Sequence, residues 1–124
     1  MADSNKNVAL LASASRTVTT PSPTQLNDSR RGCHVTVDIT VNTGGLGSIT
    51  ATIEGQDPAS GKWYTILASA VLTAVGTVVL RVYPGLVVAA NLAANDILPR
   101  TWRVNVVANN ANPVTYSVGS SAVR

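Results

Sequence analysis

Residues 33–41 read CHVTVDITV, and apolar and polar side chains alternate through the whole stretch. Every odd position, from Cys33 to Val41, is apolar, and every even position carries a polar side chain. Successive side chains of a β-strand point to opposite faces of a sheet. The stretch therefore predicts a strand with one face in a hydrophobic core and the other in water, as in antiparallel sheets.

The same period of two continues on both sides of this stretch. Residues 55–62 read GQDPASGK, which has the Pro and Gly of a tight reversal, with Gly61 at a left-handed position. Together with the alternation around it, this turn predicts a β-hairpin over residues 48–68. Residues 86–98 (LVVAANLAANDIL) lack the alternation, and any helix is expected there. Further strands are expected at residues 8–12, 77–83, 100–107 and 114–118.

This succession of short strands and turns predicts an all-β fold. The expected architecture is an antiparallel two-sheet β-sandwich of the jelly-roll or immunoglobulin-like kind. Before it, Pro21-Ser22-Pro23 excludes a central strand and favours extended backbone. The chain is therefore expected to divide into an extended N-terminal arm, residues 1–24, and a β-sandwich domain, residues 25–124.

Composition limits the partners of the protein. Only 12% of the 124 residues are charged, about half the usual share, so we expect apolar surface to be buried against other proteins. No apolar run approaches the ~20 residues of a membrane span, and no membrane partner is expected. The net charge is +3, but apart from Arg30-Arg31 the cations are scattered along the chain. Binding to a phosphate backbone needs several cations on one surface, so no nucleic-acid partner is expected.

Residues that carry chemistry are few, and no catalytic, cofactor-binding or metal site is expected. His34 is the only histidine, and it lies on the polar face of its predicted strand. Asp38 and Glu54 lie on the outer faces of neighbouring predicted strands, where a carboxylate pair is considered, but no apolar cleft is predicted that would raise the pKa of one of them, and both are interpreted as solvated strand residues. Cys33 is the only cysteine, which excludes an internal disulfide, and it is interpreted as a small core residue. We therefore expect a protein that is not an enzyme.

The two tryptophans are interpreted as core residues. Trp102 shares its predicted strand face with Val104 and Val106, which is typical of a sandwich core. Trp63 directly follows the predicted turn, and its alternative role is a planar platform for a sugar. The chain would then be a carbohydrate- or cell-surface-binding module.

Three segments resemble small structural proteins of tailed phages. They are ITATIEGQDPASGKWY (residues 49–64), TVVLRVYPG (residues 77–85) and LPRTWR (residues 98–103). The resemblance is to β-sandwich proteins that sit on phage heads as decoration or cement subunits. It implies a virion protein on the capsid surface, made in the host cytoplasm, that binds the major capsid protein. It also implies a homo-oligomer, most commonly a trimer. A tail or head-completion protein is the alternative within the virion.

The expected contacts with partners lie at two places. Val8, Leu10 and Leu11 form an apolar patch in the predicted arm, and Trp63 lies beside the hairpin turn. An extended arm can add a strand to the sheet of its own or a neighbouring subunit. The arm is therefore expected to mediate subunit or capsid contact, while the sandwich folds without it.

Overall fold

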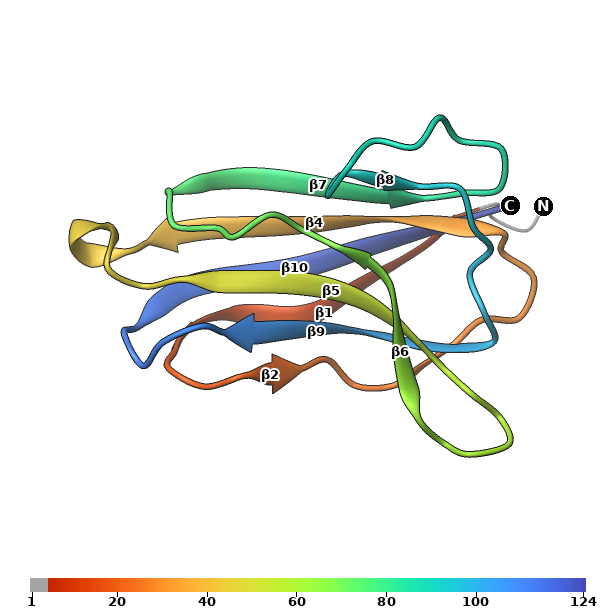
Figure 1. Ribbon diagram of the computed structural model, residues 1–124, viewed down its shortest axis with the longest axis horizontal. Helices are drawn as coiled ribbons and strands as arrows, with labels where there is room; N and C mark the ends of the chain where they lie inside the picture. The colour runs from red at the N-terminus through yellow and green to blue at the C-terminus, as the bar shows by residue number, and fades with distance from the viewer. Residues whose placement is uncertain (1–4) are drawn as a thin grey trace.

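Two β-sheets face each other across one apolar core in the computed structural model, which describes residues 5–124 (Figure 1). Sheet A contains, in spatial order, β1 (Asn5–Arg16), β10 (Val114–Val123), β4 (Gly32–Val41), β7 (Gly76–Val82) and β8 (Ala93–Ala94). Sheet B contains β2 (Thr20–Pro21), β9 (Thr101–Ala108), β5 (Ile49–Gln56) and β6 (Trp63–Ala68), and β3 (Gln25–Leu26) also pairs with β9. The predicted all-β class is confirmed.

Two details of the predicted architecture are wrong. Sheet A is mixed, because β8 runs parallel to β7, whereas an antiparallel fold was expected. The single helical turn in residues 5–124 is the 3₁₀ turn Thr43–Gly45, outside the expected range 86–98. Gly44 and Gly45 adopt positive φ within it, so the segment is a kinked pair of tight turns that only glycine accommodates easily. Residues 93–94 instead hydrogen-bond alongside β7, where Ala93 is buried.

The core is built mainly from the inward faces of β4, β5, β9 and β10, and β1, β6 and β7 add buried residues to it. The alternation of residues 33–41 is confirmed from Cys33 to Ile39, where the apolar positions are buried, while Val41 lies beyond the core and is exposed. Trp102 is 3% exposed, as predicted for a core residue. The inward set of β10 is Val114, Tyr116, Val118, Ser120 and Ala122. Both sheets therefore contribute every second residue to one core.

Cys33 is one of these core residues, and its burial raises the pKa of the thiol to about 12. The thiolate is the nucleophile, so a raised pKa and burial both suppress its reactivity. We expect native protein at about pH 8 to resist iodoacetamide, whereas protein unfolded in guanidinium is alkylated within minutes. Mass spectrometry of timed samples measures this. Equal rates in the two states would show that Cys33 is accessible.

The predicted hairpin is confirmed as β5 and β6, joined by residues 57–62. Asp57 organises the turn: its carboxylate accepts hydrogen bonds from the Ser60 hydroxyl (2.7 Å) and the Ala59 N–H (3.0 Å). The Ser60 bond, followed by the Ala59 bond, lowers the pKa of the Asp57 carboxyl. The Gly61 N–H donates to the Asp57 carbonyl, and Gly61 has φ of 75°. The predicted left-handed glycine is therefore present.

Substitution of Gly61 is expected to destabilise the protein. A branched side chain is strained at this φ, so Gly61→Val should lower the free energy of unfolding by about 1–2 kcal/mol. Gly119 is a matched control, because it lies in a regular strand with space around its Cα. Gly119→Ala should leave the urea midpoint nearly unchanged. Equal midpoints for the two variants would contradict the strain at Gly61.

The segment expected as an arm lies within the sheets over its described part. β1 pairs antiparallel with β10, from Asn5 opposite Val123 to Arg16 opposite Val114. β2 then crosses to sheet B and pairs with β9. The sequence left open whether this segment pairs with the sheet of its own subunit or with that of a neighbour. In the structure it pairs with its own. Residues 1–4 of the expected arm lie outside the described residues, and folding of residues 25–124 alone stays a prediction.

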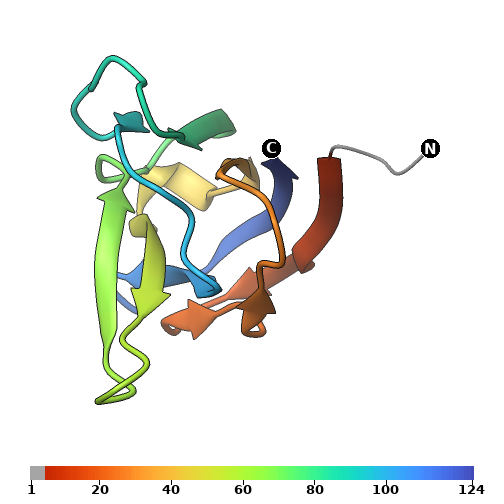
Figure 2. The same cartoon turned by 90° about the vertical axis from the view of Figure 1, so that its right-hand side faces the viewer.

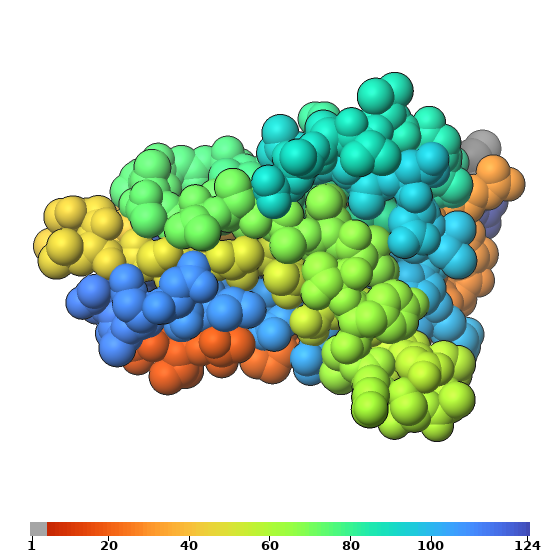
Figure 3. Space-filling view, viewed as in Figure 1, coloured from red at the N-terminus to blue at the C-terminus, as the bar shows by residue number. Residues whose placement is uncertain are grey.

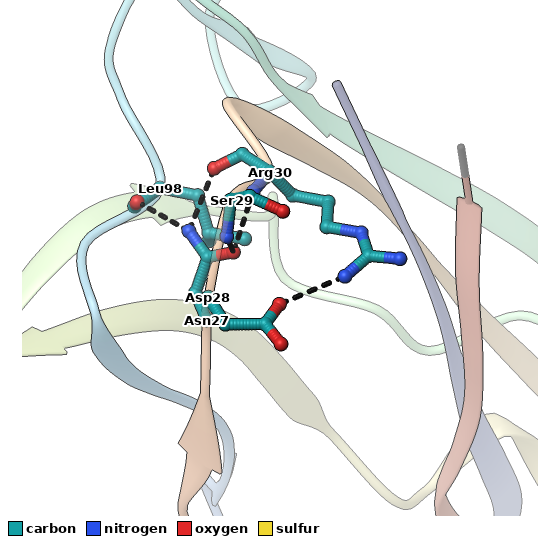
Figure 4. Close-up of polar contacts among 5 residues, drawn as sticks. All are labelled: Asn27, Asp28, Ser29, Arg30 and Leu98. Atoms are coloured by element: carbon teal, nitrogen blue, oxygen red, sulfur yellow. Dashed lines mark hydrogen bonds and ion pairs between the residues drawn. The ribbon is translucent and has the colours of Figure 1, made fainter. Parts of the chain in front are cut away.

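The loop before β4 is closed by one asparagine (Figure 4). The Asn27 amide nitrogen donates to the Arg30 carbonyl (2.7 Å) and to the Leu98 carbonyl (2.9 Å). The Asn27 amide oxygen accepts from the Arg30 N–H (2.9 Å) and, more weakly, from the Ser29 N–H. One side chain thus closes residues 27–30 and fastens them to the chain entering β9.

Asn27→Ala is expected to lower the free energy of unfolding by about 1–3 kcal/mol, since it leaves two carbonyls without their donor. Asn27→Asp should cost a similar amount, because a carboxylate cannot donate to either carbonyl. Asp28→Ala in the same loop removes an ion pair whose Asp28 carboxylate is exposed while Arg30 is largely buried, and it should cost about 1 kcal/mol or less. Urea unfolding of the three variants tests this; a stable Asn27→Asp variant would exclude the donor role.

Candidate interaction surfaces

The expected contact patch in β1 lies largely in the core. Leu10 is only 4% exposed and belongs to the core cluster. Val8 and Leu11 are half-buried and pack against the same cluster. Two bulges, between Ala9 and Leu11 and between Leu11 and Ala14, interrupt the register with β10. These three side chains therefore serve the fold of their own subunit, and Leu10 is out of reach of a partner.

Trp63 lies on the outer face of sheet B, so its interpretation as a core residue is wrong. It is half-buried, and the Arg103 guanidinium lies 4.1 Å from the centre of its ring. Arg103 in turn donates from Nε to Glu54 Oε1 at 2.8 Å. One face of the indole is therefore covered by a cation that is held in place, which leaves less of it for a stacked sugar.

The carboxylates considered for catalysis lie far apart in the fold. Asp38 is on the outer face of sheet A, where it accepts a hydrogen bond from the Thr77 hydroxyl, and Glu54 is on the outer face of sheet B. The two do not form a carboxylate pair, because the consecutive strands β4 and β5 belong to different sheets. His34 is exposed beside Arg81, as its polar-face position predicted. Within residues 5–124, no three His, Cys, Asp or Glu residues meet as metal ligands would.

Exposed apolar side chains gather instead at the end of the sandwich where β4 stops. Val41, Leu46, Val71 and Val75 are each more than half exposed. We call these four residues the loop patch. Three loops form this end, residues 41–48, 69–76 and 109–113, and none of them contains a charged residue. Figure 3 shows the first two side by side, in yellow and light green.

The loops under the loop patch are held in one arrangement. The Asn42 amide nitrogen donates to the Gly47 carbonyl (2.9 Å) and to the Thr73 carbonyl (2.6 Å), which joins two of the three loops. Ile49 and Leu72 exchange two backbone hydrogen bonds, at 2.8 and 3.1 Å. Residues 71–78 also line a shallow hollow of about 300 Å³. The apolar side chains are thus presented on a fixed base.

A second exposed apolar set lies on the connection from β7 to β9. It comprises Val87, Val88, Leu92 and Ile97, and Val87 is 88% exposed. Neither this set nor the loop patch was predicted, because isolated Val and Leu residues between strands carry no periodic signal. The sequence signal that could have revealed the loop patch is the absence of charged residues in its three loops, because surface loops are normally polar.

No model of a known protein family matches the chain, and no curated protein matches it either. None of residues 5–124 forms a helix with the length and hydropathy needed to cross a bilayer.

Proposed function

We propose that the protein is a structural subunit of a tailed-phage virion, a decoration or cement protein on the capsid surface. In this role it binds the assembled shell of major capsid protein, associates with itself as a trimer and catalyses no reaction. The observation that carries the proposal is the loop patch, an uncharged end of the molecule with four exposed apolar side chains. The resemblance of residues 49–64, 77–85 and 98–103 to phage head proteins supplies the biological setting.

We also propose that the fold is a jelly roll. The nested pairing of its strands supports this: β1 pairs with β10, β2 with β9, β4 with β7 and β5 with β6. Such nesting is what results when one long antiparallel hairpin of eight strands is wound into two sheets. Capsid and lectin domains are among the proteins that use this winding.

The loop patch suits self-association. Monomeric proteins rarely leave large contiguous apolar patches in water, and the exposed side chains here lie on a base fixed by Asn42. In a closed ring of subunits such a patch is covered without any change of fold. Association also multiplies weak contacts of each subunit with the capsid through avidity.

Addition of purified protein to undecorated capsid shells tests the proposed function. We expect it to co-sediment with the shells and to appear in cryo-microscopy as density on their outer surface. Density on the tail of complete virions would place the protein there and contradict a role in decorating the head. Failure to bind any part of the virion would overturn the proposal.

The trimer is tested separately by sedimentation equilibrium. Val71→Ser/Val75→Ser removes apolar surface from the loop patch and should shift the protein toward monomer by at least tenfold in dissociation constant. Val87→Ser/Val88→Ser makes the same chemical change in the other exposed set and should leave the trimer intact. Equal behaviour of the two double variants would exclude the loop patch as the subunit interface.

A further inference from the structure

The fold gathers scattered cations at the end of the sandwich opposite the loop patch. Lys6 pairs with Ala122, near the end of β10, and Arg81 lies beside His34 on the neighbouring strands β7 and β4. The Arg31 N–H donates to the Val123 carbonyl at 2.8 Å. Figure 2 looks at this end and shows the start of β1 and the end of β10 near the loop that enters β4.

Other cations belong to the same end. The Asn27 N–H donates to the Arg100 carbonyl at 2.6 Å and the Leu98 N–H to the Arg31 carbonyl at 2.9 Å, so the chain entering β9 lies along the loop that carries Arg30 and Arg31. Arg124 follows β10, where the Tyr83 hydroxyl donates to its carbonyl at 2.8 Å. Six of the nine Lys and Arg residues of the chain therefore lie here. We call them the basic end: Lys6, Arg30, Arg31, Arg81, Arg100 and Arg124.

Acidic residues balance little of this charge. Asp28 forms an ion pair with Arg30 at 2.8 Å, and Asp96 lies nearby in the chain that leads to Leu98. Of the other acids within residues 5–124, Asp38 is paired opposite Thr77, Glu54 forms an ion pair with Arg103, and Asp57 lies in the hairpin turn. The ion pairs within residues 5–124 leave Lys6, Arg31, Arg81 and Arg100 without a carboxylate partner. Among residues 5–124, the basic end therefore has six cations and two carboxylate side chains, Asp28 and Asp96.

A pocket of about 180 Å³ opens within the basic end. Tyr83, Leu86, Val82 and Val123 give it apolar walls, and Arg81 and His34 also line it. Arg31 and Arg124 lie next to Val123, through a hydrogen bond and along the chain. The pocket therefore has room for an aliphatic side chain, with Arg81 in its wall and the backbone of Arg31 and Arg124 next to Val123 at its edge.

We propose that the basic end binds an acidic segment of a partner protein, in which an aliphatic side chain enters the pocket and flanking carboxylates meet Arg81 and Arg31. Guanidinium groups bind carboxylates through two parallel hydrogen bonds, which fixes the orientation of such a segment. Complementary charge also speeds the encounter of the two surfaces. On the proposed function, the partner is the capsid shell, and the basic end is the side of the subunit that faces it.

The pocket favours a protein over a nucleic acid. Single-stranded nucleic acids are bound on several stacked aromatic side chains, and Tyr83 is the one Phe, Tyr or Trp residue that lines this pocket. Apolar walls instead match an aliphatic side chain, and exposed Val87 and Val88 follow Leu86 closely in the chain. Positive charge alone would attract either an acidic protein segment or a nucleic acid. The apolar pocket is the feature that favours the protein segment.

Labelled pentapeptides test the inference without a capsid. We expect the peptide EELEE to bind the full chain at low salt at least tenfold more tightly than QQLQQ and several-fold more tightly than EEGEE, by fluorescence anisotropy. Arg31→Glu/Arg81→Glu should weaken EELEE binding at least tenfold, and Leu86→Ala should remove the preference for EELEE over EEGEE. Lys62→Glu, an exposed cation on the hairpin turn, is the control and should change binding less than twofold.

The outcomes separate this inference from the proposed function. Equal affinity for EELEE and QQLQQ, or tighter binding of a single-stranded DNA oligonucleotide than of EELEE, would overturn the acidic-segment site. On shells, the Arg31→Glu/Arg81→Glu variant should remain a trimer and lose binding. Shell binding by this variant at the wild-type level would also overturn the inference, while leaving the decoration role in place. Wild-type protein that binds EELEE but no part of the virion would overturn only the decoration role.

Discussion

Removal of strand β1 is expected to unfold the protein. Deletion of residues 2–17 takes away one of the two partner strands of β10, which pairs along its whole length, and the buried Leu10 side chain. Loss of one buried leucine costs about 2–5 kcal/mol, and a domain of this size has a total stability of about 5–15 kcal/mol. The deletion also removes the Arg16 guanidinium, which donates to the Tyr116 carbonyl at 2.9 Å and lies over the Tyr116 ring.

Far-UV circular dichroism and urea titration of the truncated chain measure this. The division predicted from the sequence, an arm and a self-sufficient domain, requires the opposite result: a cooperative transition near that of the full chain. If the truncated chain aggregates, a point variant measures the contribution of β1 to stability instead. Leu10→Ala should lower the stability by about 2–5 kcal/mol, whereas Ala9→Ser, on the exposed face of the same strand, should be nearly neutral.

Trp102→Ala is expected to be the most damaging single substitution in sheet B. The side chain is 3% exposed on the inward face of β9, between buried neighbours at positions 104 and 106 and the strand β3 that pairs beside it. Truncation of a buried tryptophan costs about 3–5 kcal/mol through lost burial and the cavity left behind. The urea midpoint of Trp102→Ala should therefore fall well below the wild-type value.

Trp63→Ala is the matched control for this prediction. Its ring lies on the outer face against Arg103, and loss of a partly solvated cation–π contact costs about 0.5–1 kcal/mol. Urea titrations of the two variants should thus differ severalfold in destabilisation. Similar midpoints would show that the burial assigned to one of the two tryptophans is wrong.

The two proposed interactions lie at opposite ends of the sandwich: self-association at the loop patch and partner binding at the basic end. β4 runs from the basic end, at Gly32, to the loop patch, at Val41, so the two surfaces are separated by the length of a strand (Figure 1). Apolar contact suits the permanent association of identical subunits. Charged contact suits recognition of a separate, preassembled partner.

Local pattern was enough for most strands and for the main turn. The alternation of residues 33–41 and the Pro and Gly residues of 55–62 are local signals, which involve only residues close together in the chain. The strand and the turn that they predicted were both confirmed. The length of β10 was underestimated, because Gly119, Ser120 and Ser121 have low strand propensity and are held by β1 on one side and β4 on the other. Trp63 was misplaced because the outward direction of the first residue of β6 depends on its pairing with Gln56.

By itself, the sequence determined that the chain is all-β, where most strands lie, that Cys33 and Trp102 are buried and that the hairpin closes on a left-handed Gly61. These properties follow from side-chain period and backbone preference, which are local. Tertiary structure alone decided that β1 completes sheet A, that Asp38 and Glu54 face away from each other, and that six cations meet at one end. Those results depend on which strands pair, and nested pairing brings together residues up to 118 positions apart, such as Asn5 and Val123.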